Sequence, residues 1–218
     1  MRPVLRLYED TLANNVMVQL PALARMIFVV HGAVAIAGRM FSDEEAWQGE
    51  EELSLEAGPS GVTYWRWELA PEGAAGEAAG SGVRSREKLA AALQHLPAGD
   101  LLLRGDSVGF PPAGCAYLHR HQGPGIRCLI EGGIRIDTHG GSTSYGPGGA
   151  WYESGPDPVF AQAAADRPSR FIRVMILPRA LLGKNSIEYL NEEDRAKPKS
   201  QRYQLLADAA IVWPPAPR

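Results

Sequence analysis

The sequence predicts an all-β protein assembled from two similar halves. Glycine (24 residues) and proline (17 residues) are frequent in this chain of 218 residues, and most of them interrupt short apolar runs. Short strands bounded by turn residues produce that pattern. A unit of strand, glycine turn and strand also occurs in each half, which favours a duplicated β-domain.

The apolar runs between the turns define the expected strands. They are Met26–Ala37, Glu52–Leu55, Val62–Leu69, Leu101–Arg104, Cys115–His121, Ile126–Asp137, Ala150–Glu153 and Phe171–Leu177.

The repeat is visible when the two halves are aligned. Residues 25–36 (RMIFVVHGAVAI) match residues 125–136 (GIRCLIEGGIRI), and each segment is followed by a strand that ends in proline. Those strands are residues 64–71 (YWRWELAP) and 171–178 (FIRVMILP). The alignment predicts one β-domain in residues 1–70 and a second in residues 99–182.

The remaining segments are expected to connect or flank these domains. Residues 71–83 are rich in alanine and glycine, as in a flexible linker. A helix is expected over Arg86–Leu96, with Ser85 as its N-cap and Pro97 as its stop, so residues 71–98 form a linker and helix. Residues 183–218 are expected to be a tail without chemistry of its own.

Composition excludes several classes of protein. The formal net charge of −3 gives no electrostatic reason to expect nucleic acid as a partner. No apolar run approaches the roughly 20 residues needed to cross a bilayer, so no membrane association is expected. Two cysteines, Cys115 and Cys128, are too few for a disulfide framework, which indicates a cytoplasmic protein with free thiols; the alternative is a single bridge between the two.

The most informative motif is a pair of histidines, His119 and His121, in an alternating segment. Because side chains alternate along a strand, the two imidazoles point to the same face. Two imidazoles on one rigid strand provide half of a site for a first-row transition metal.

The motif around this pair resembles that of the cupin superfamily of jelly-roll barrels. In that family a glycine leads to His-x-His, then to a glutamate and a second glycine. Here Gly114 precedes the histidines, with one residue fewer than the pattern, and Gly132 stands at the closing position. The expected glutamate falls at Gly125, which has no side chain to bind a metal.

The second cupin motif is matched more loosely. Gly148 and the segment Glu153–Gly155 follow its outline, but Pro158 stands where the family has its third histidine. The resemblance covers residues 99–180 and extends to residues 15–70 through the repeat. It implies a bicupin, a protein of two tandem double-stranded β-helix barrels, with a degenerate metal motif in the second.

A third metal ligand is needed, and Glu153 is the leading candidate because it lies in the strand of the second motif. Two histidines and one carboxylate form the facial arrangement of non-haem iron enzymes. Asp157, Tyr152 and Gln122 are weaker candidates. The resemblance implies a divalent transition metal (Fe, Mn, Ni or Zn); the alternative is that both histidines line a metal-free relic of the site.

Two further residues are candidates for catalysis. Strict alternation would place Tyr117 and Cys115 on the face of the histidines, with Tyr117 as a proton donor or a plain wall residue. If Gly125 faces the lumen, Arg127 does too and would suit a carboxylate or enolate ligand. A strand twist or bulge would instead turn Arg127 to solvent.

These observations support hypotheses from different classes. The first is a metal-dependent enzyme that acts on a small molecule, with dioxygenase, isomerase or lyase chemistry among the reactions of the superfamily. The alternative is a non-catalytic, ligand-binding or structural bicupin with a relic metal site. A homodimer is expected in either case, because pairing would cover exposed sheet edges.

Overall fold

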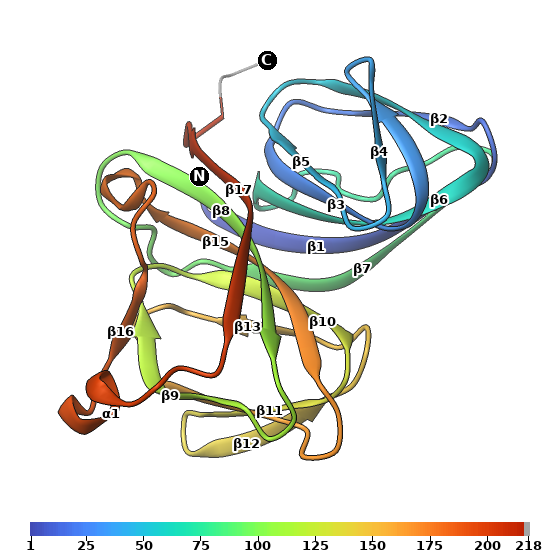
Figure 1. The fold of residues 1–218 in the computed structure, drawn as a ribbon. Helices are drawn as coiled ribbons and strands as arrows, with labels where there is room; N and C mark the ends of the chain where they lie inside the picture. Colours follow the sequence, from blue (N-terminus) through green and yellow to red (C-terminus); the bar gives the residue numbers. More distant parts are fainter. Residues whose placement is uncertain (216–218) are drawn as a thin grey trace. The chain divides into compact units, whose positions relative to one another are not determined.

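The computed structural model describes residues 1–215 and divides the chain into two compact units (Figure 1). The first comprises Met1–Gln94 and the chain end from Ile211, and the second comprises His95–Ala210. Each unit is built from antiparallel strands, which confirms the all-β class expected from the turn-rich sequence.

The first unit is a single seven-stranded sheet in the order β4-β3-β6-β1-β7, with β2 paired to β6 and β5 paired to β3. Its strands are β1 (Pro3–Leu12), β2 (Met17–Leu20), β3 (Ala24–Ile36), β4 (Arg39–Ser42), β5 (Ala46–Gly49), β6 (Leu53–Pro71) and β7 (Val83–Ala92). Register shifts in β3 at Val29/His31 and Gly32/Val34 mark bulges in its pairing with β6. Bulges bend a strand, so one long sheet can wrap an apolar core that includes Ile27, Val34 and Leu55.

The expected helix over Arg86–Leu96 is wrong. Residues 83–92 form strand β7, which pairs antiparallel with β1 along its whole length. Alanine, lysine and glutamate favour a helix locally, but pairing with β1 satisfies the backbone of this segment within a sheet. Tertiary structure therefore overrides the local propensity.

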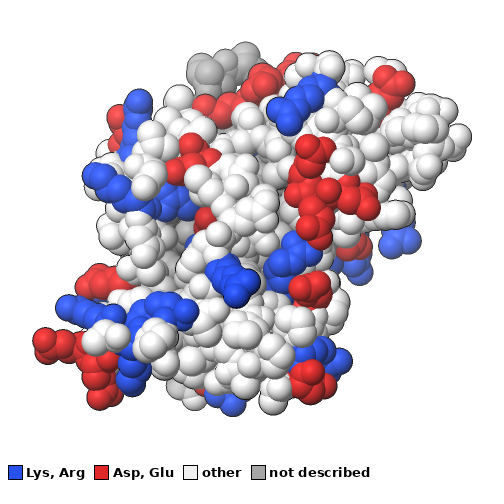
Figure 2. All heavy atoms as spheres, in the orientation of Figure 1, with Lys and Arg blue, Asp and Glu red and all other residues white. Residues whose placement is uncertain are grey.

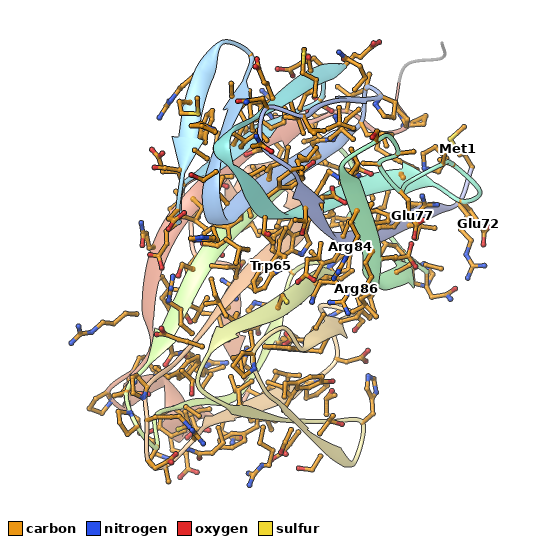
Figure 3. The ribbon with its side chains drawn as sticks, turned by 90° about the vertical axis from the view of Figure 1, so that its right-hand side faces the viewer. Met1, Trp65, Glu72, Glu77, Arg84 and Arg86 are labelled. Atoms are coloured by element: carbon orange, nitrogen blue, oxygen red, sulfur yellow. The ribbon has the colours of Figure 1, made fainter. Side chains whose placement is uncertain are left out.

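The strands β6, β1 and β7 carry a cross-strand group of polar side chains. Glu9 lies opposite Trp65 on one neighbour and Arg86 on the other. It accepts a hydrogen bond from the indole nitrogen of Trp65 (3.2 Å) and one from Arg86 (2.8 Å), two residues that Figure 3 labels close together.

The second unit consists of two five-stranded sheets, in the orders β13-β10-β15-β8-β17 and β12-β11-β14-β9-β16. The first contains β8 (Leu101–Phe110), β10 (Gly125–Glu131), β13 (Ala150–Glu153), β15 (Ser169–Pro178) and β17 (Arg202–Ile211). The second contains β9 (Cys115–His121), β11 (Ile134–Thr138), β12 (Gly141–Tyr145), β14 (Val159–Ala163) and β16 (Ile187–Tyr189). The expected strand Ile126–Asp137 is thus two strands, β10 and β11, separated by Gly132, whose φ of 82° turns the chain.

The two sheets of the second unit enclose one apolar core. Phe171, Trp151 and Leu129 enter it from the first sheet, and Ile136 and Val159 enter it from the second. On β14 the alternation of buried and half-buried residues is complete over Val159–Ala163, which is the signature of a strand with one face on a core. This double-sheet sandwich is a jelly-roll architecture.

Residues 183–210 of the expected tail belong to the second unit. There β16 pairs with β9, β17 pairs with β8, and the helix α1 (Glu192–Ala196) forms a short turn. The 3₁₀ helix η1 (Arg179–Leu181) lies just before this segment. The last three residues of this expected tail, 216–218, lie outside the described residues. Among residues 1–215 no helix is long and apolar enough to cross a membrane.

Charged groups of both signs are interspersed on the face of the molecule shown in Figure 2. Lysine and arginine do not form a continuous basic stripe on that face, such as a nucleic acid backbone would need.

Candidate metal centre

The two histidines project from β9 into the interior of the second unit, between its two sheets. Both are buried, with His119 and His121 each 4% exposed. Their rings lie edge to face with centroids 4.9 Å apart. The shared face predicted from the i, i+2 spacing is therefore present.

A bulge in β9 decides which other residues share this face. In the pairing with β14, Val159 lies opposite His119 and Ala161 opposite Ala116, so three steps on β9 match two on β14. The extra residue shifts the alternation, and Ala116 joins the histidines on the inner face.

Because of this bulge, Tyr117 does not line the cavity beside the histidines. Its ring instead lies beneath the ammonium groups of Lys197 (5.1 Å) and Lys199 (5.4 Å). The expectation that Cys115 and Tyr117 share the face of the histidines is wrong, since strict alternation was assumed across a bulge.

Glu153 reaches the histidines from the opposite sheet. On β13 it pairs in register with Gly125 of β10, so the carboxylate rises beside the position where the first cupin motif has its glutamate. A side chain at position 125 would not fit, because a Cβ there would lie 2.5 Å from the Val174 carbonyl oxygen and 2.9 Å from Nη1 of Arg127. A carboxylate from the neighbouring strand therefore stands beside the vacant motif position.

The three side chains bring their ligand atoms together. One donor atom from each of His119, His121 and Glu153 lies within 4.8 Å of the others. Nε2 of His121 lies 3.8 Å from Oε2 of Glu153. Ligand atoms bound to one ion at ~2.1 Å can be at most ~4.2 Å apart, so a side-chain shift of under ~1 Å would complete the set.

The protonation states of the imidazoles suit a metal. Nδ1 of His119 lies 2.7 Å from the carbonyl oxygen of Tyr117, which fixes the tautomer with Nε2 free to donate its lone pair. Burial lowers the pKa of His119 below its usual value, against the raising effect of Glu153. Burial, then Arg173 and Arg127, place the pKa of His121 well below its usual value. Both rings are therefore neutral near pH 7, as metal ligands must be.

Arg127 points inward and holds Glu153. Its side chain is 1% exposed, and Nη2 lies 2.7 Å from Oε2 of Glu153. Nη1 donates to the carbonyl oxygen of Gly125 (2.7 Å), and Nε1 of Trp151 donates to the other carboxylate oxygen (2.9 Å). Burial lowers the pKa of Arg127 to about 10, so the guanidinium remains charged at neutral pH.

A second buried ion pair, between Arg173 and Asp106, was not predicted from the sequence. Arg173 on β15 donates to Oδ2 of Asp106 on β8 through Nε (3.2 Å) and Nη2 (2.7 Å). Its Nη1 lies 3.5 Å from Nε2 of His121. The available signal was an arginine inside the otherwise apolar run FIRVMIL, at the repeat position that Arg66 occupies in the first half.

The weaker ligand candidates lie elsewhere. Asp157 is half exposed and faces His139 (3.6 Å), outside the group of three. Tyr152 points to the other side of β13 from Glu153, because adjacent residues alternate. Gln122 follows the end of β9 and does not line the cavity.

The three candidate ligands border an inner cavity of ≈ 20 Å³, lined also by Arg127, Arg173 and the apolar residues around Trp151. That space is large enough for about one water-sized group. Nδ1 of His121 is buried without a hydrogen bond of normal geometry. Two neutral imidazoles and an anchored carboxylate fit a divalent cation. Two contacts of the ligand atoms compete with it: Nη1 of Arg173 on His121, which would have to move aside, and Nη2 of Arg127 on Oε2 of Glu153, which would have to share that oxygen.

No protein-family model and no curated protein sequence matches the chain. Solved structures do match its fold. Oxalate decarboxylase from Lactobacillus farciminis, in a formate complex, aligns over 88% of this chain and 82% of its own, with 12% identity and a TM-score of 0.63.

Two further structures give the same result. Oxalate decarboxylase from Bacillus subtilis aligns over 88% of this chain and 72% of its own, with 12% identity and a TM-score of 0.61. AerE from Microcystis aeruginosa aligns over 82% and 89%, with 12% identity and a TM-score of 0.56. This chain has the cupin fold. The cupin fold suggested by the His-x-His motif is confirmed, and at this low identity the likeness concerns the fold alone.

Within the cupin fold, the described contacts place the candidate site in the second unit. The first unit has a different interior at the matching place. There Arg66 forms ion pairs with Asp10 (2.6 Å) and Glu68 (2.7 Å), and Glu68 also pairs with Arg25 (2.9 Å). These groups neutralise one another within the sheet.

Proposed function

We propose that the second unit of this cupin binds one divalent transition metal (Fe, Mn, Ni or Zn) through His119, His121 and Glu153 and acts on a small molecule. The observation that carries the proposal is the convergence of three buried donor atoms within 4.8 Å from two facing sheets. The neutral state of both imidazoles supports it.

The chain's own residues would prepare this site before any ligand arrives. The Tyr117 carbonyl orients His119, and Arg127 with Trp151 orients Glu153. A bound metal would supply Lewis-acid activation with open positions for substrate or oxygen. Arg127 would hold the carboxylate in place beside the histidines, and the surrounding apolar core would exclude bulk water.

The comparisons support this proposal from outside the chain. One matched structure of the Bacillus subtilis oxalate decarboxylase comes from work on the Mn(II) centres of that enzyme. Both oxalate decarboxylases act on a small molecule, so an enzyme of dioxygenase, isomerase or lyase type is the class we propose here. We also propose a cytoplasmic homodimer, supported by a count of two cysteines, too few for a disulfide framework, and by sheets that end in edge strands such as β12.

A specific observation favours a second function, a metal-free ligand-binding cupin. The pairs Arg127–Glu153 and Arg173–Asp106 already neutralise one another, and Arg173 also contacts the His121 lone pair. A site that is satisfied in this way can persist without a metal.

Metal analysis separates the two functions. Protein stripped with a chelator and reloaded with Mn²⁺, Fe²⁺, Ni²⁺ or Zn²⁺ should retain about one equivalent after gel filtration. The double variant His119→Ala/His121→Ala should retain less than about 0.1 equivalents, whereas His139→Ala, an exposed histidine of the same unit, should match the wild type. Wild-type retention below about 0.1 equivalents of every metal would favour the metal-free function.

A further inference from the structure

A larger space lies next to the inner cavity in the second unit. This outer chamber has a volume of ≈ 260 Å³ and is lined by residues that include Arg104, Arg173, Lys184, Ile187, Tyr203 and Leu205. Its size approaches the ~300 Å³ at which small-molecule sites begin. The inner cavity, at ≈ 20 Å³, is too small for an organic substrate.

Two residues line both spaces, Arg173 and Tyr203. The guanidinium carbon of Arg173 lies 5.7 Å from the centre of the Tyr203 ring, so the two side chains form a common wall. Arg173 also touches His121 on the inner side and Asp106 on the chamber side. A small movement of this wall would join the two spaces.

The chamber is held in shape by Arg104. Its guanidinium donates to the carbonyl oxygens of Leu181 (2.7 Å) and Lys184 (2.6 Å) and to both carboxylate oxygens of Asp208 (2.9 and 3.0 Å). These bonds fasten the loop after η1 and the strand β17 to the rest of the unit. The segment after residue 182 therefore builds one side of the chamber.

Charge indicates which ligand the two spaces would accept. Four cationic side chains line them, Arg104, Arg127, Arg173 and Lys184, and the carboxylates are three, Asp106, Glu153 and Asp208. A divalent metal would add two more positive charges to this small excess. Arg104 pairs with Asp208, Arg173 with Asp106 and Arg127 with Glu153, whereas Lys184 is exposed. The uncompensated buried charge would therefore be that of the metal, and because such charge is costly, an anionic ligand would restore the balance.

The chamber also offers apolar surface. Tyr203 and Leu205 on β17 line it and are 48% and 58% exposed, and Ile187 lines it from β16. An apolar ligand body would cover this surface, while its acidic group would face Arg173, whose planar fork suits a carboxylate.

We propose that the outer chamber is the ligand site of the metal centre, that its ligand is an organic anion with an apolar body, and that the acidic group of this ligand reaches the inner cavity past Arg173 and Tyr203. The inference rests on the proposed function for the metal, and it extends that function to the route and the substrate class.

Chelator access to Zn²⁺-loaded protein tests the route. Pyridine-2,6-dicarboxylate, an aromatic dianion, and 1,10-phenanthroline, a neutral ring system of similar size, would each remove Zn²⁺ at a rate followed by the absorbance of the complex. Tyr203→Ala should raise the rate of Zn²⁺ removal by both chelators at least about threefold, because the variant opens the wall between the two spaces. Arg202→Ala, the adjacent residue on β17 that lines a different groove, should change neither rate.

A charge reversal tests the ligand class. Lys184→Glu should lower the rate of Zn²⁺ removal by the dianion at least about fivefold and the rate of removal by phenanthroline less than about twofold. Added salt should reduce the difference between these two effects. Arg202→Glu makes the same charge change outside the chamber and should have less than about half that effect on the dianion.

Each result decides the inference. Equal effects of Lys184→Glu and Arg202→Glu would overturn the ligand class, and unchanged rates in Tyr203→Ala would overturn the route. If wild-type protein holds no Zn²⁺, the proposed function fails by itself. The chamber can then be tested as a ligand site on metal-free protein. Benzoate, but not benzamide, should shift the methyl NMR signals of Ile187 and Leu205. No shift at millimolar benzoate would overturn the chamber as a ligand site as well.

Discussion

The residues around the candidate centre show why a buried charge needs a partner. Arg127 and Glu153 lie 2.7 Å apart, and their side chains are 1% and 9% exposed. Removing one of them leaves the other as an unpaired charge in a buried site. Replacing both by apolar groups removes the attraction and the desolvation cost together.

Arg127→Met should therefore lower the free energy of unfolding of the metal-free protein by about 3 kcal/mol, because the Glu153 carboxylate loses its partner. The double variant Arg127→Met/Glu153→Met should recover most of that loss. Chemical denaturation of the wild type, Arg127→Met, Glu153→Met and the double variant measures the coupling. A double variant no more stable than Arg127→Met would mean that packing by Arg127, and not its charge, is what the single variant removes.

Glu9 in the first unit predicts a pH dependence. Burial, the largest influence, raises its pKa, but the Trp65 indole and Lys88, with a smaller effect of Arg86, together bring the pKa below its usual value. The folded carboxylate thus holds its proton less tightly than the unfolded one. Stability from this group is present above the unfolded pKa of about 4.3 and is lost as the pH falls through the lower folded pKa.

Between about pH 5 and pH 3, the unfolding free energy of the wild type should fall more steeply than that of Glu9→Gln. At neutral pH the variant should be less stable by about 1 kcal/mol. Glu72→Gln, at an exposed glutamate whose side chain is 58% accessible, should follow the wild-type slope. Parallel slopes for wild type and Glu9→Gln would show that the contacts of Glu9 do not favour its charged form.

The site residues could be predicted from the sequence where their spacing along one strand determines the direction of their side chains. They could not be predicted where pairing between distant strands determines it. The spacing of His119 and His121 put both rings on one face, and strand order was enough to bring Glu153 into consideration. The position of Tyr117 depended on a bulge that no residue type marks. Asp106 and Arg173 are far from the motif in sequence, and only the sheet brings them beside it.

Among the elements, β7 is the one in which the local helix propensity of the sequence and the tertiary structure disagree. Its sequence VRSREKLAAA contains many good helix formers, yet it is an edge strand of the first sheet, paired only with β1. Strands such as β3, β10 and β15 were predicted from their apolar runs, whereas β1, β14 and β17 were not predicted and β7 was predicted as a helix. The strand state of β7 depends on its pairing with β1, which lies 71 to 88 residues earlier in the chain.

The state of β7 can be tested by substitution at Ala90, which is exposed. Threonine favours a strand and disfavours a helix, so Ala90→Thr should leave stability unchanged or raise the unfolding free energy by up to about 0.5 kcal/mol. In a helix the same change would cost about 0.5 kcal/mol. Thermal and chemical unfolding of the variant distinguishes the two, and Ala90→Gly, unfavourable in both states, serves as the control for sensitivity.

At the scale of the whole molecule, the two units carry a buried arginine at equivalent positions, but the groups around that arginine differ. Arg66 stands five residues before Pro71, and Arg173 stands five before Pro178, each opposite the first strand of its own unit. Arg66 is closed in by Asp10, Glu68 and the Gly76 carbonyl oxygen. Arg173 instead borders an open chamber and a set of metal ligands. The same position of the repeat thus carries a buried arginine in both units, while the groups around it differ.

This difference predicts how metal binding changes stability. A ligand that binds only the folded state stabilises it by about 2.7 kcal/mol at a hundredfold excess over its dissociation constant. Because the candidate ligands all belong to His95–Ala210, Mn²⁺ or Zn²⁺ should raise the unfolding temperature of that unit alone. Calorimetry should then show one transition that moves with metal concentration and one that does not, and hydrogen exchange should assign the moving one to the strands of the second unit. In His119→Ala/His121→Ala both transitions should stay in place. A single transition that moves as a whole would show instead that the two units unfold together, so that a metal bound in one stabilises both.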